Sequence, residues 1–125
     1  MTERSKPEID FPDGEPPTEL EVHDEVAGDG PEAVRGSTVS AHYVGVAYST
    51  GEEFDASWSR GAPLDFRLGV GQVIAGWDQG IEGMKVGGRR KLVIPAALAY
   101  GDRGAGAAIA PGETLIFVVD LVAVR

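Results

Sequence analysis

A short, glycine-rich amphipathic segment at residues 71–84 limits the folds open to this chain more than any other feature. Its apolar side chains recur at the helical period, and its polar side chains face away. The apolar members are Val73, Ile74, Trp77, Ile81 and Met84. Gly76, Gly80 and Gly83 interrupt the segment, and each costs about 1 kcal/mol of helix propensity relative to alanine. Such a helix is not stable alone, so we expect the rest of the chain to pack around it.

Stretches of alternating apolar and polar residues predict the strands that pack around this helix. They lie at residues 20–23, 38–48, 64–68, 89–94 and 114–124. The connections between them are too short for crossover helices, so we expect mainly antiparallel pairing. Residues 96–100 are expected to form a single helical turn. We therefore predict an α+β fold in which a curled antiparallel sheet of five to six strands packs over one short helix.

Side-chain alternation assigns the faces of the two longest predicted strands. Tyr43 points to one side of its strand and His42 to the other, so we interpret His42 as an outward-facing residue rather than a metal ligand. In the last strand Phe117 and Leu121 share one side, which we expect the helix to cover. Three adjacent cations at residues 89–91 are interpreted as the solvated edge of a strand, with a polyanion site as the alternative.

The amino-terminal residues differ in composition from the rest of the chain. Residues 1–30 contain ten acidic and two basic residues, and the remaining ten acidic and nine basic residues of the total of 20 and 11 nearly cancel. Four of the eight prolines lie before residue 18, with few large apolar side chains among them. Such a segment buries too little surface to offset the entropy of ordering it. We predict a disordered, acidic, proline-rich arm at residues 1–18 and one folded domain at residues 19–125.

Composition excludes several classes of function. The sequence has no cysteine, which rules out disulfides and thiolate chemistry, and it has only two histidines, so we expect no metal site and no cofactor. The acidic arm would repel phosphates, so nucleic acid is not an expected partner. No segment has the ~20 apolar residues of a membrane span, and the amino terminus lacks the apolar run of a secretory signal. We expect a soluble, cytoplasmic monomer that does not contact membranes.

Five aromatic residues are distributed over the predicted elements, and they admit two interpretations. They are Tyr43, Phe54, Trp77, Tyr100 and Phe117. They either form the core, or they line a concave apolar pocket in which the tyrosine hydroxyls and a few other polar groups provide specificity. Asp55, next to Phe54, is then either a solvated loop residue or one of those polar groups. The sequence contains no Gly-x-Ser-x-Gly or His-Glu-x-x-His motif for nucleophilic or zinc catalysis.

Several ordered motifs together resemble one known family. They are Phe54-Asp55, Val73-Ile74-x-Gly76-Trp77, Gly83-Met84-x-x-Gly87, Ala99-Tyr100-Gly101, and Ile109-x-Pro111 followed by Thr114-Leu115-x-Phe117. In order and spacing they look like the FKBP-type peptidyl-prolyl cis-trans isomerases, which also bind the macrolides tacrolimus and rapamycin. The resemblance extends from about residue 19 to Arg125. Residues 101–112 contain no insertion large enough for a separate chaperone domain, so the resemblance to the chaperone-like bacterial subgroup is weaker.

The resemblance implies a half-barrel of antiparallel strands around a short helix, with the substrate proline between the two. It implies catalytic roles for Phe54, Asp55 and Tyr100. It implies substrate binding by Tyr43, Leu64, Phe66, Val73, Ile74, Trp77, Ile109 and Phe117. The Trp77 indole would be the pocket floor, the Ile74 backbone N–H would hold a substrate carbonyl, and Ile109 would lie on an overhanging loop. Leu64 stands where the family often has an aromatic residue, and Ala105 where a histidine is common.

The implied chemistry needs no nucleophile. Resonance resists rotation about an X-Pro bond, and the uncatalysed exchange takes tens to hundreds of seconds. A twisted amide has lost that resonance and is less polar, so an apolar, water-poor site favours it. The expected partners are therefore X-Pro peptides and unfolded proteins, together with tacrolimus- or rapamycin-type macrolides. The alternative is a non-catalytic module that binds proline-containing segments or a partner protein; the presence of both Asp55 and Tyr100 favours catalysis.

Overall fold

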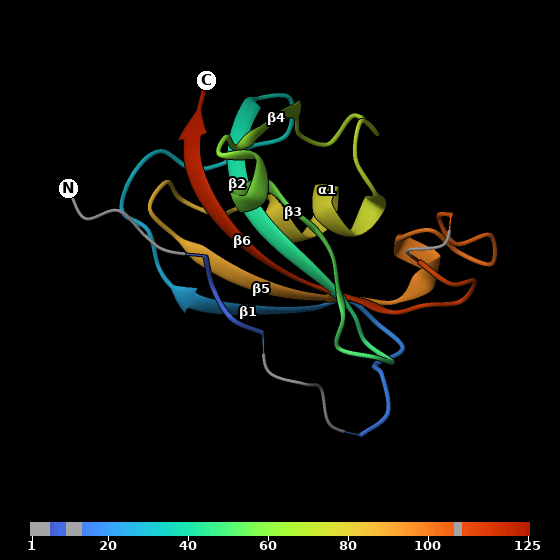
Figure 1. The fold of residues 1–125 in the computed structure, drawn as a ribbon. Coiled ribbons are helices and arrows are strands. Elements are labelled where there is room, and N and C mark those ends of the chain that lie inside the picture. The colour runs from blue at the N-terminus through green and yellow to red at the C-terminus, as the bar shows by residue number, and fades with distance from the viewer. Residues whose placement is uncertain (1–5, 10–13, 107–108) are drawn as a thin grey trace.

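A computed structural model describes residues 6–9, 14–106 and 109–125 of the chain. Its strands are β1 (Glu21–Val26), β2 (Thr38–Ala47), β3 (Glu53–Ala56), β4 (Leu64–Arg67), β5 (Arg89–Ile94) and β6 (Leu115–Val124). They pair antiparallel in the order β1-β5-β6-β2-β3, and β4 also pairs with β2. The sheet curls around the helix α1 (Ala75–Ile81) in Figure 1. This arrangement confirms the predicted α+β class and antiparallel half-barrel.

The sequence pattern does not predict two short elements, the strand β3 and the 3-10 helix η1 (Ser57–Arg60) that follows it along the chain. β3 has four residues, two of them acidic, and it pairs with one neighbour, β2, at the edge of the sheet. A second 3-10 helix, η2 (Ala96–Leu98), lies where the sequence predicts a helical turn. Together, β3 and η1 bring Phe54, Asp55 and Arg60 to one rim of the half-barrel.

The helix α1 has seven residues, which corrects the longer helix expected over residues 71–84. Val73 and Ile74 precede it, and it ends at Ile81, after which Glu82 is extended. Gly83 then takes a φ of 91°, a left-handed conformation that glycine adopts without steric cost. The apolar residues of this segment still face the core. Those at its two ends, however, belong to loops rather than to the helix.

The two glycines within α1 allow the helix to approach the sheet. A Cβ atom added to Gly76 would lie 2.4 Å from a methyl carbon of Ile94, and one added to Gly80 would lie 2.7 Å from a methyl carbon of Leu92. Real side chains would clash at such distances. The propensity cost of these glycines is therefore offset by close packing of α1 on β5, which fixes how near the helix lies to the sheet.

The core lies between α1 and the concave face of the sheet. Tyr43 and Val39 of β2 and Phe117 of β6 are buried there, together with Trp77 and Ile81 of the helix. This confirms the predicted faces of β2 and β6. His42 lies on the opposite, outer face, where its ring stacks on Trp58 with 4.2 Å between ring centroids.

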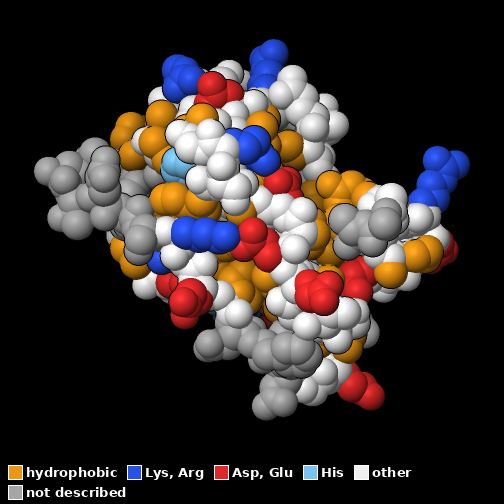
Figure 2. All heavy atoms as spheres, in the orientation of Figure 1, with side chains coloured by type: hydrophobic (Ala, Val, Ile, Leu, Met, Phe, Trp, Pro, Cys, Tyr) orange, Lys and Arg blue, Asp and Glu red, His pale blue; other side chains and the backbone are white. Residues whose placement is uncertain are grey.

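The outer face of the sheet carries aliphatic clusters that the arm touches. Val44, Ala56 and Val118 form one cluster, Val46, Val93 and Ile116 form the other, and Ile9 packs against both. The Lys6 Nζ atom lies 2.6 Å from the Glu53 Oε1 atom. Figure 2 shows acidic, basic and apolar side chains interspersed over one face of the molecule. Arm residues 1–5 and 10–13 lie outside the described residues, and disorder of the arm stays a prediction.

Arg89 and Arg90, two of the three adjacent cations at the start of β5, form ion pairs within the fold. Arg89 forms an ion pair with Asp120, with 2.6 Å between the closest atoms. Arg90 pairs with Asp24 and donates to the carbonyl oxygens of Gly80 and Glu82 at the carboxyl end of α1, at 2.8 and 3.2 Å. Arg90 therefore links the helix to the edge of the sheet. In the part of the chain that the structure describes, no helix has the length and apolar character needed to cross a membrane.

Candidate active site

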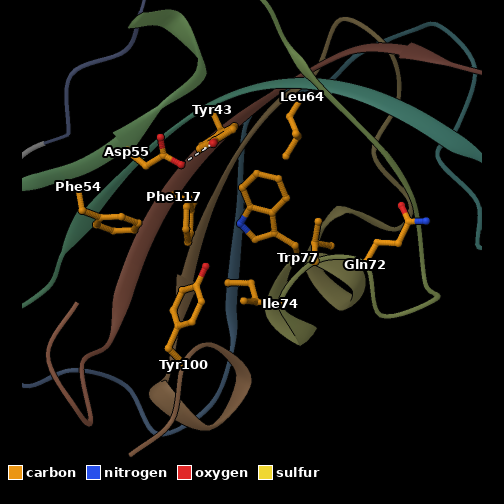
Figure 3. Close-up of a pocket in the computed structure, with 10 residues that line it drawn as sticks. Tyr43, Phe54, Asp55, Leu64, Gln72, Ile74, Trp77, Tyr100 and Phe117 are labelled. Atoms are coloured by element: carbon orange, nitrogen blue, oxygen red, sulfur yellow. Dashed lines mark hydrogen bonds between the residues drawn. The ribbon is translucent and has the colours of Figure 1, made fainter. Parts of the chain in front are cut away.

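A cavity of about 390 Å³ opens between α1 and the concave face of the sheet. Its lining is largely aromatic and aliphatic and comes from β2, β3, β4, β6, the loop before α1, α1 itself and the loop after η2 (Figure 3). The lining residues are Tyr43, Phe54, Asp55, Leu64, Gln72, Val73, Ile74, Trp77, Tyr100 and Phe117. The volume suits a small ring and its flanking backbone, which is typical of ligand sites.

Aromatic rings that meet nearly at right angles form the floor and one wall of the cavity. The Trp77 ring lies 4.9 Å from the Tyr43 ring at 78° and 5.2 Å from the Phe117 ring at 87°. Phe54 meets Phe117 at 88° with 5.5 Å between centroids. Edge-to-face pairs of this kind are favourable, and they leave ring faces and edges exposed to the cavity. The rings therefore keep the cavity open rather than collapsing into it.

The indole nitrogen of Trp77 is buried and has no hydrogen-bond acceptor among the described residues. Figure 3 shows this nitrogen on the side of the indole that faces Phe117. The perpendicular contact with Phe117 is the geometry in which an aromatic face can accept an N–H. The Trp77 N–H therefore faces an aromatic ring rather than an oxygen or nitrogen acceptor.

A polar triangle of Tyr43, Asp55 and Arg60 closes one rim. The Tyr43 hydroxyl donates to Asp55 Oδ2 at 2.5 Å. The Arg60 guanidinium donates to Asp55 Oδ1 at 2.9 Å and to the Tyr43 oxygen at 2.8 Å. Each of the two carboxylate oxygens therefore has a donor, which fixes the plane of the Asp55 carboxylate at the cavity edge. The sequence motifs do not single out Arg60; its position five residues after Asp55, across η1, brings it into reach.

Two further polar groups lie at the opposite side of the cavity. Ile74 immediately precedes α1, and its carbonyl accepts the N–H groups of Trp77 and Asp78 at 2.9 and 3.2 Å. Its own N–H has no acceptor among the described residues. Tyr100 is 40% exposed, and its hydroxyl points toward the cavity in Figure 3. A carbonyl-bearing ligand between Ile74 and Tyr100 would thus meet two donors above an aromatic floor.

Comparison with known proteins decides the family. The family model for FKBP-type peptidyl-prolyl cis-trans isomerases matches residues 30–122. The chain is 74% identical to an FK506-binding protein of Streptomyces anulatus over 95% of this chain and 97% of that one. The chain belongs to the FKBP-type peptidyl-prolyl cis-trans isomerases. It is thus an enzyme that accelerates rotation about X-Pro bonds.

Other relatives of this FKBP-type isomerase support the same assignment. A probable FK506-binding protein of Corynebacterium glutamicum is 50% identical over 94% of this chain and 97% of that one. The crystal structure of AtFKBP13 superposes with a TM-score of 0.79 at 48% identity, over 85% of this chain and 93% of that chain. The crystal structure of FkpA from Escherichia coli superposes with a TM-score of 0.77 at 42% identity, over 85% of this chain but 48% of that chain.

The structure brings together nine of the eleven site residues that the sequence predicts for this FKBP-type isomerase. Phe66 and Ile109 are not among the lining residues. Phe66 is buried behind the floor, 5.6 Å from the Trp77 ring, and Ile109 is 4% exposed and pairs with Ala105. Contact of these two with substrate stays a prediction. Gln72 lines the cavity but lies outside the predicted set, because its exposed position before the helix carries no pattern signal.

The polar triangle also sets the charge state of the FKBP-type site. Burial alone would raise the pKa of Asp55, but the hydrogen bonds from Tyr43 and Arg60 and the charge of Arg60 outweigh it, and the net pKa lies below its ordinary value. The pKa of Tyr43 is raised, first by burial and then by its hydrogen bond to Asp55. At neutral pH the site therefore presents a carboxylate, a neutral phenol and a guanidinium.

Proposed function

We propose that this cavity is the place where the isomerase rotates the X-Pro bond. The observation that carries the proposal is an aromatic floor of Trp77 and Phe117 beside an unoccupied backbone donor, the Ile74 N–H. A twisted amide is less polar than a planar one, so an apolar floor favours it over the planar ground state. The Ile74 N–H would hold the carbonyl that follows the proline, and this keeps the ring over the indole while the preceding bond turns.

Asp55 and Tyr100 act in this proposal as fixed polar groups rather than as proton carriers. Arg60 and Tyr43 hold the Asp55 carboxylate at the rim, where it stabilises the altered charge distribution of the twisted amide. The Tyr100 hydroxyl donates a hydrogen bond to a substrate carbonyl from the other side. Phe54 covers the reacting bond and limits its contact with water. No bond is broken, so no group needs to change its protonation state.

We also propose that tacrolimus- and rapamycin-type macrolides occupy the same cavity and compete with peptides. The similarity to proteins named FK506-binding protein supports this proposal, as does the aromatic lining. One copy of the chain supplies every lining residue, which supports action as a monomer. Cytoplasmic placement stays a prediction from composition.

The test of the proposed site is a protease-coupled isomerisation assay on a short X-Pro peptide, with increasing tacrolimus. We expect turnover by the full chain, and we expect one equivalent of the macrolide to abolish it. Turnover that persists with the macrolide bound would place the reaction outside this cavity. Absence of macrolide binding, with normal turnover, would refute only the macrolide proposal.

A further inference from the structure

The loop between β4 and α1 supplies three of the cavity's lining residues, yet it has no regular secondary structure. It runs over residues 68–74, and Gln72, Val73 and Ile74 at its end contact the cavity. The Ile74 N–H, the backbone donor of the site, belongs to this loop. A loop of this kind contributes a well-placed wall only if something other than helix or sheet bonding holds it.

The Asp78 carboxylate on α1 holds the first half of this loop. Asp78 Oδ1 accepts the Gly69 N–H at 2.8 Å, and Asp78 Oδ2 accepts the Gly71 N–H at 3.0 Å. Both glycines have left-handed φ values, 84° and 80°, which turn the two N–H groups toward one carboxylate. Hydrogen bonds from backbone N–H groups to a charged acceptor are stronger than those between neutral partners.

A second side chain closes the loop on the strand side. The Gln72 Oε1 atom accepts the Arg67 N–H at 2.8 Å, at the last residue of β4. The loop is therefore bonded to the strand before it through Gln72 and to the helix after it through Asp78. These three hydrogen bonds tie the loop to the strand before it and to the helix after it, so they fix the path of the cavity wall.

We propose that Asp78 is a positioning residue for isomerisation, because it holds the loop that carries the Ile74 donor and the Val73 wall. It touches no reacting atom and acts through the backbone of Gly69 and Gly71. The inference rests on the proposal that the cavity is the site of isomerisation. Asp78 holds the binding wall in place before substrate arrives, so that substrate does not have to order the loop.

Pre-organisation makes a specific kinetic prediction. If the loop is loosened, the cost of ordering it is the same for bound substrate and for the transition state, so substrate affinity falls while the bound complex reacts at its usual rate. Asp78→Asn removes one acceptor and places an NH₂ group against an N–H donor. We expect it to raise KM about fivefold and to leave kcat within about twofold. A merely structural role would instead lower the folded fraction, which lowers apparent kcat at unchanged KM.

The experiment measures kcat and KM on one X-Pro peptide for the full chain and three variants, at a temperature where all remain folded. Gln79→Ala, next to Asp78 on the exposed side of α1, controls for changes in the helix. Ile116→Val, on the outer face, controls for loss of stability. Hydrogen exchange is measured in parallel at the Gly69, Gly71 and Arg67 amides, which the Asp78 and Gln72 side chains hold, and we expect it to accelerate in Asp78→Asn alone.

The outcomes separate this inference from the proposal on which it rests. A raised KM with faster exchange at Gly69, Gly71 and Arg67 supports the inference. Unchanged KM in Asp78→Asn, or an equal rise in Ile116→Val, overturns it. The variant Phe54→Ala is measured alongside: if it also keeps full kcat/KM while folded, the cavity itself is not the site. A loss in Phe54→Ala with none in Asp78→Asn refutes the positioning role and leaves the cavity assignment intact.

Discussion

Two hollows of similar size lie on opposite faces of the same sheet, and their linings differ. The cavity on the concave face measures about 390 Å³ and is walled by aromatic rings and aliphatic side chains. The groove on the outer face measures about 340 Å³. It is lined by Glu15, Pro17, Glu21, His23, Tyr48, Lys91, Val93 and Ile116. Volume alone therefore does not distinguish a prolyl site from a surface groove of this protein.

The difference in lining follows from how the two faces are packed. On the concave face the rings of Trp77, Tyr43 and Phe117 cross at steep angles and hold a space open between sheet and helix. The outer groove has charged Glu21 and Lys91 at its surface, and these keep water in it. A twisted amide gains from losing water and polar neighbours, so only the concave hollow can favour it.

The largest expected effect comes from truncating matched apolar residues on the two faces. Phe54→Ala in the cavity should lower kcat/KM more than tenfold, because a removed ring admits water and leaves the reacting bond uncovered, a loss of about 2 kcal/mol in transition-state stabilisation. Ile116→Ala on the outer face should leave kcat/KM within about twofold, although it costs ~2–5 kcal/mol of stability. Circular dichroism establishes folding before rates are compared. Similar losses of kcat/KM in both variants would contradict the assignment of turnover to the concave face.

The second prediction concerns how kcat/KM depends on pH, given the charge states of the polar triangle. Asp55 has a lowered pKa and Tyr43 a raised one, so neither changes charge between about pH 6 and pH 8, and kcat/KM should be flat there. A sigmoid or bell in that range, together with a solvent isotope effect of about two or more, would instead indicate proton transfer. The measurement is kcat/KM on one X-Pro peptide, in light and in heavy water.

The same triangle predicts the acid limb of stability. The pKa of Asp55 is lower in the folded state than in the unfolded chain, so its interactions stabilise the fold at neutral pH. That stabilisation is lost as pH falls through the folded pKa, below about pH 4. Chemical unfolding from pH 7 to pH 2.5 should therefore show a steeper loss for the native chain than for Asp55→Asn. Parallel curves for the two proteins would contradict the pairing of Asp55 with Tyr43 and Arg60.

The sequence predicts the long elements of this fold well and the short ones poorly. The strand at residues 89–94 has the predicted bounds, and the alternation of β2 assigns Tyr43 and His42 to the correct faces, because burial of one face imposes a period of two. β3 is too short and too polar to show that period. The helix is shorter than expected, because its apolar spacing continues into loops that the core also covers.

The site residues that belong to sequence motifs could be predicted. Those that join the site only through tertiary contacts could not. Nine predicted residues line the cavity, because the resemblance covers their motifs. Arg60 and Asp78 act through hydrogen bonds to groups on other elements, and one sequence gives no signal for such pairs. For Arg90 the sequence interpretation was wrong: as one of three adjacent cations it looks solvated, yet it donates to the carbonyl oxygens of Gly80 in α1 and of Glu82 just after the helix.

A smaller effect, on macrolide affinity, is expected from substitution at the rim of the cavity. Leu64 lines the cavity above the Trp77 indole in Figure 3, where an aromatic side chain would present a larger apolar surface. Leu64→Phe should tighten the binding of a tacrolimus-type macrolide by roughly threefold to tenfold, as expected for one added aromatic contact. Fluorescence titration gives the dissociation constant, and Leu64→Ile, which keeps the side chain aliphatic, is the control. Equal affinities for all three proteins would show that this rim does not contact the macrolide.

The smallest expected effect on turnover comes from removing the arm, whose described residues contact the outer face and the turn at Tyr48. Ile9 packs against both outer clusters, and Lys6 pairs with Glu53 at an exposed site, where an ion pair contributes ~0–1 kcal/mol. Deleting residues 1–17 should therefore lower the melting temperature by a few degrees through lost apolar contact. Turnover should stay within about twofold, because none of the arm residues that the structure describes lines the cavity.

A matched pair of variants separates the contribution of the Ile9 contact from that of the Lys6–Glu53 ion pair. Ile9→Ser in the full chain should reproduce most of the loss in melting temperature, whereas Lys6→Gln should change it little, since the apolar contact is partly buried and the ion pair is exposed. Glu53 directly precedes Phe54 on β3, which gives the arm one route to the cavity. A fall in kcat/KM after deletion that Lys6→Gln reproduces would mean that the ion pair holds β3 in place. The two faces of the sheet would then be coupled through that strand, and the contrast between an active concave face and an inert outer face would no longer hold.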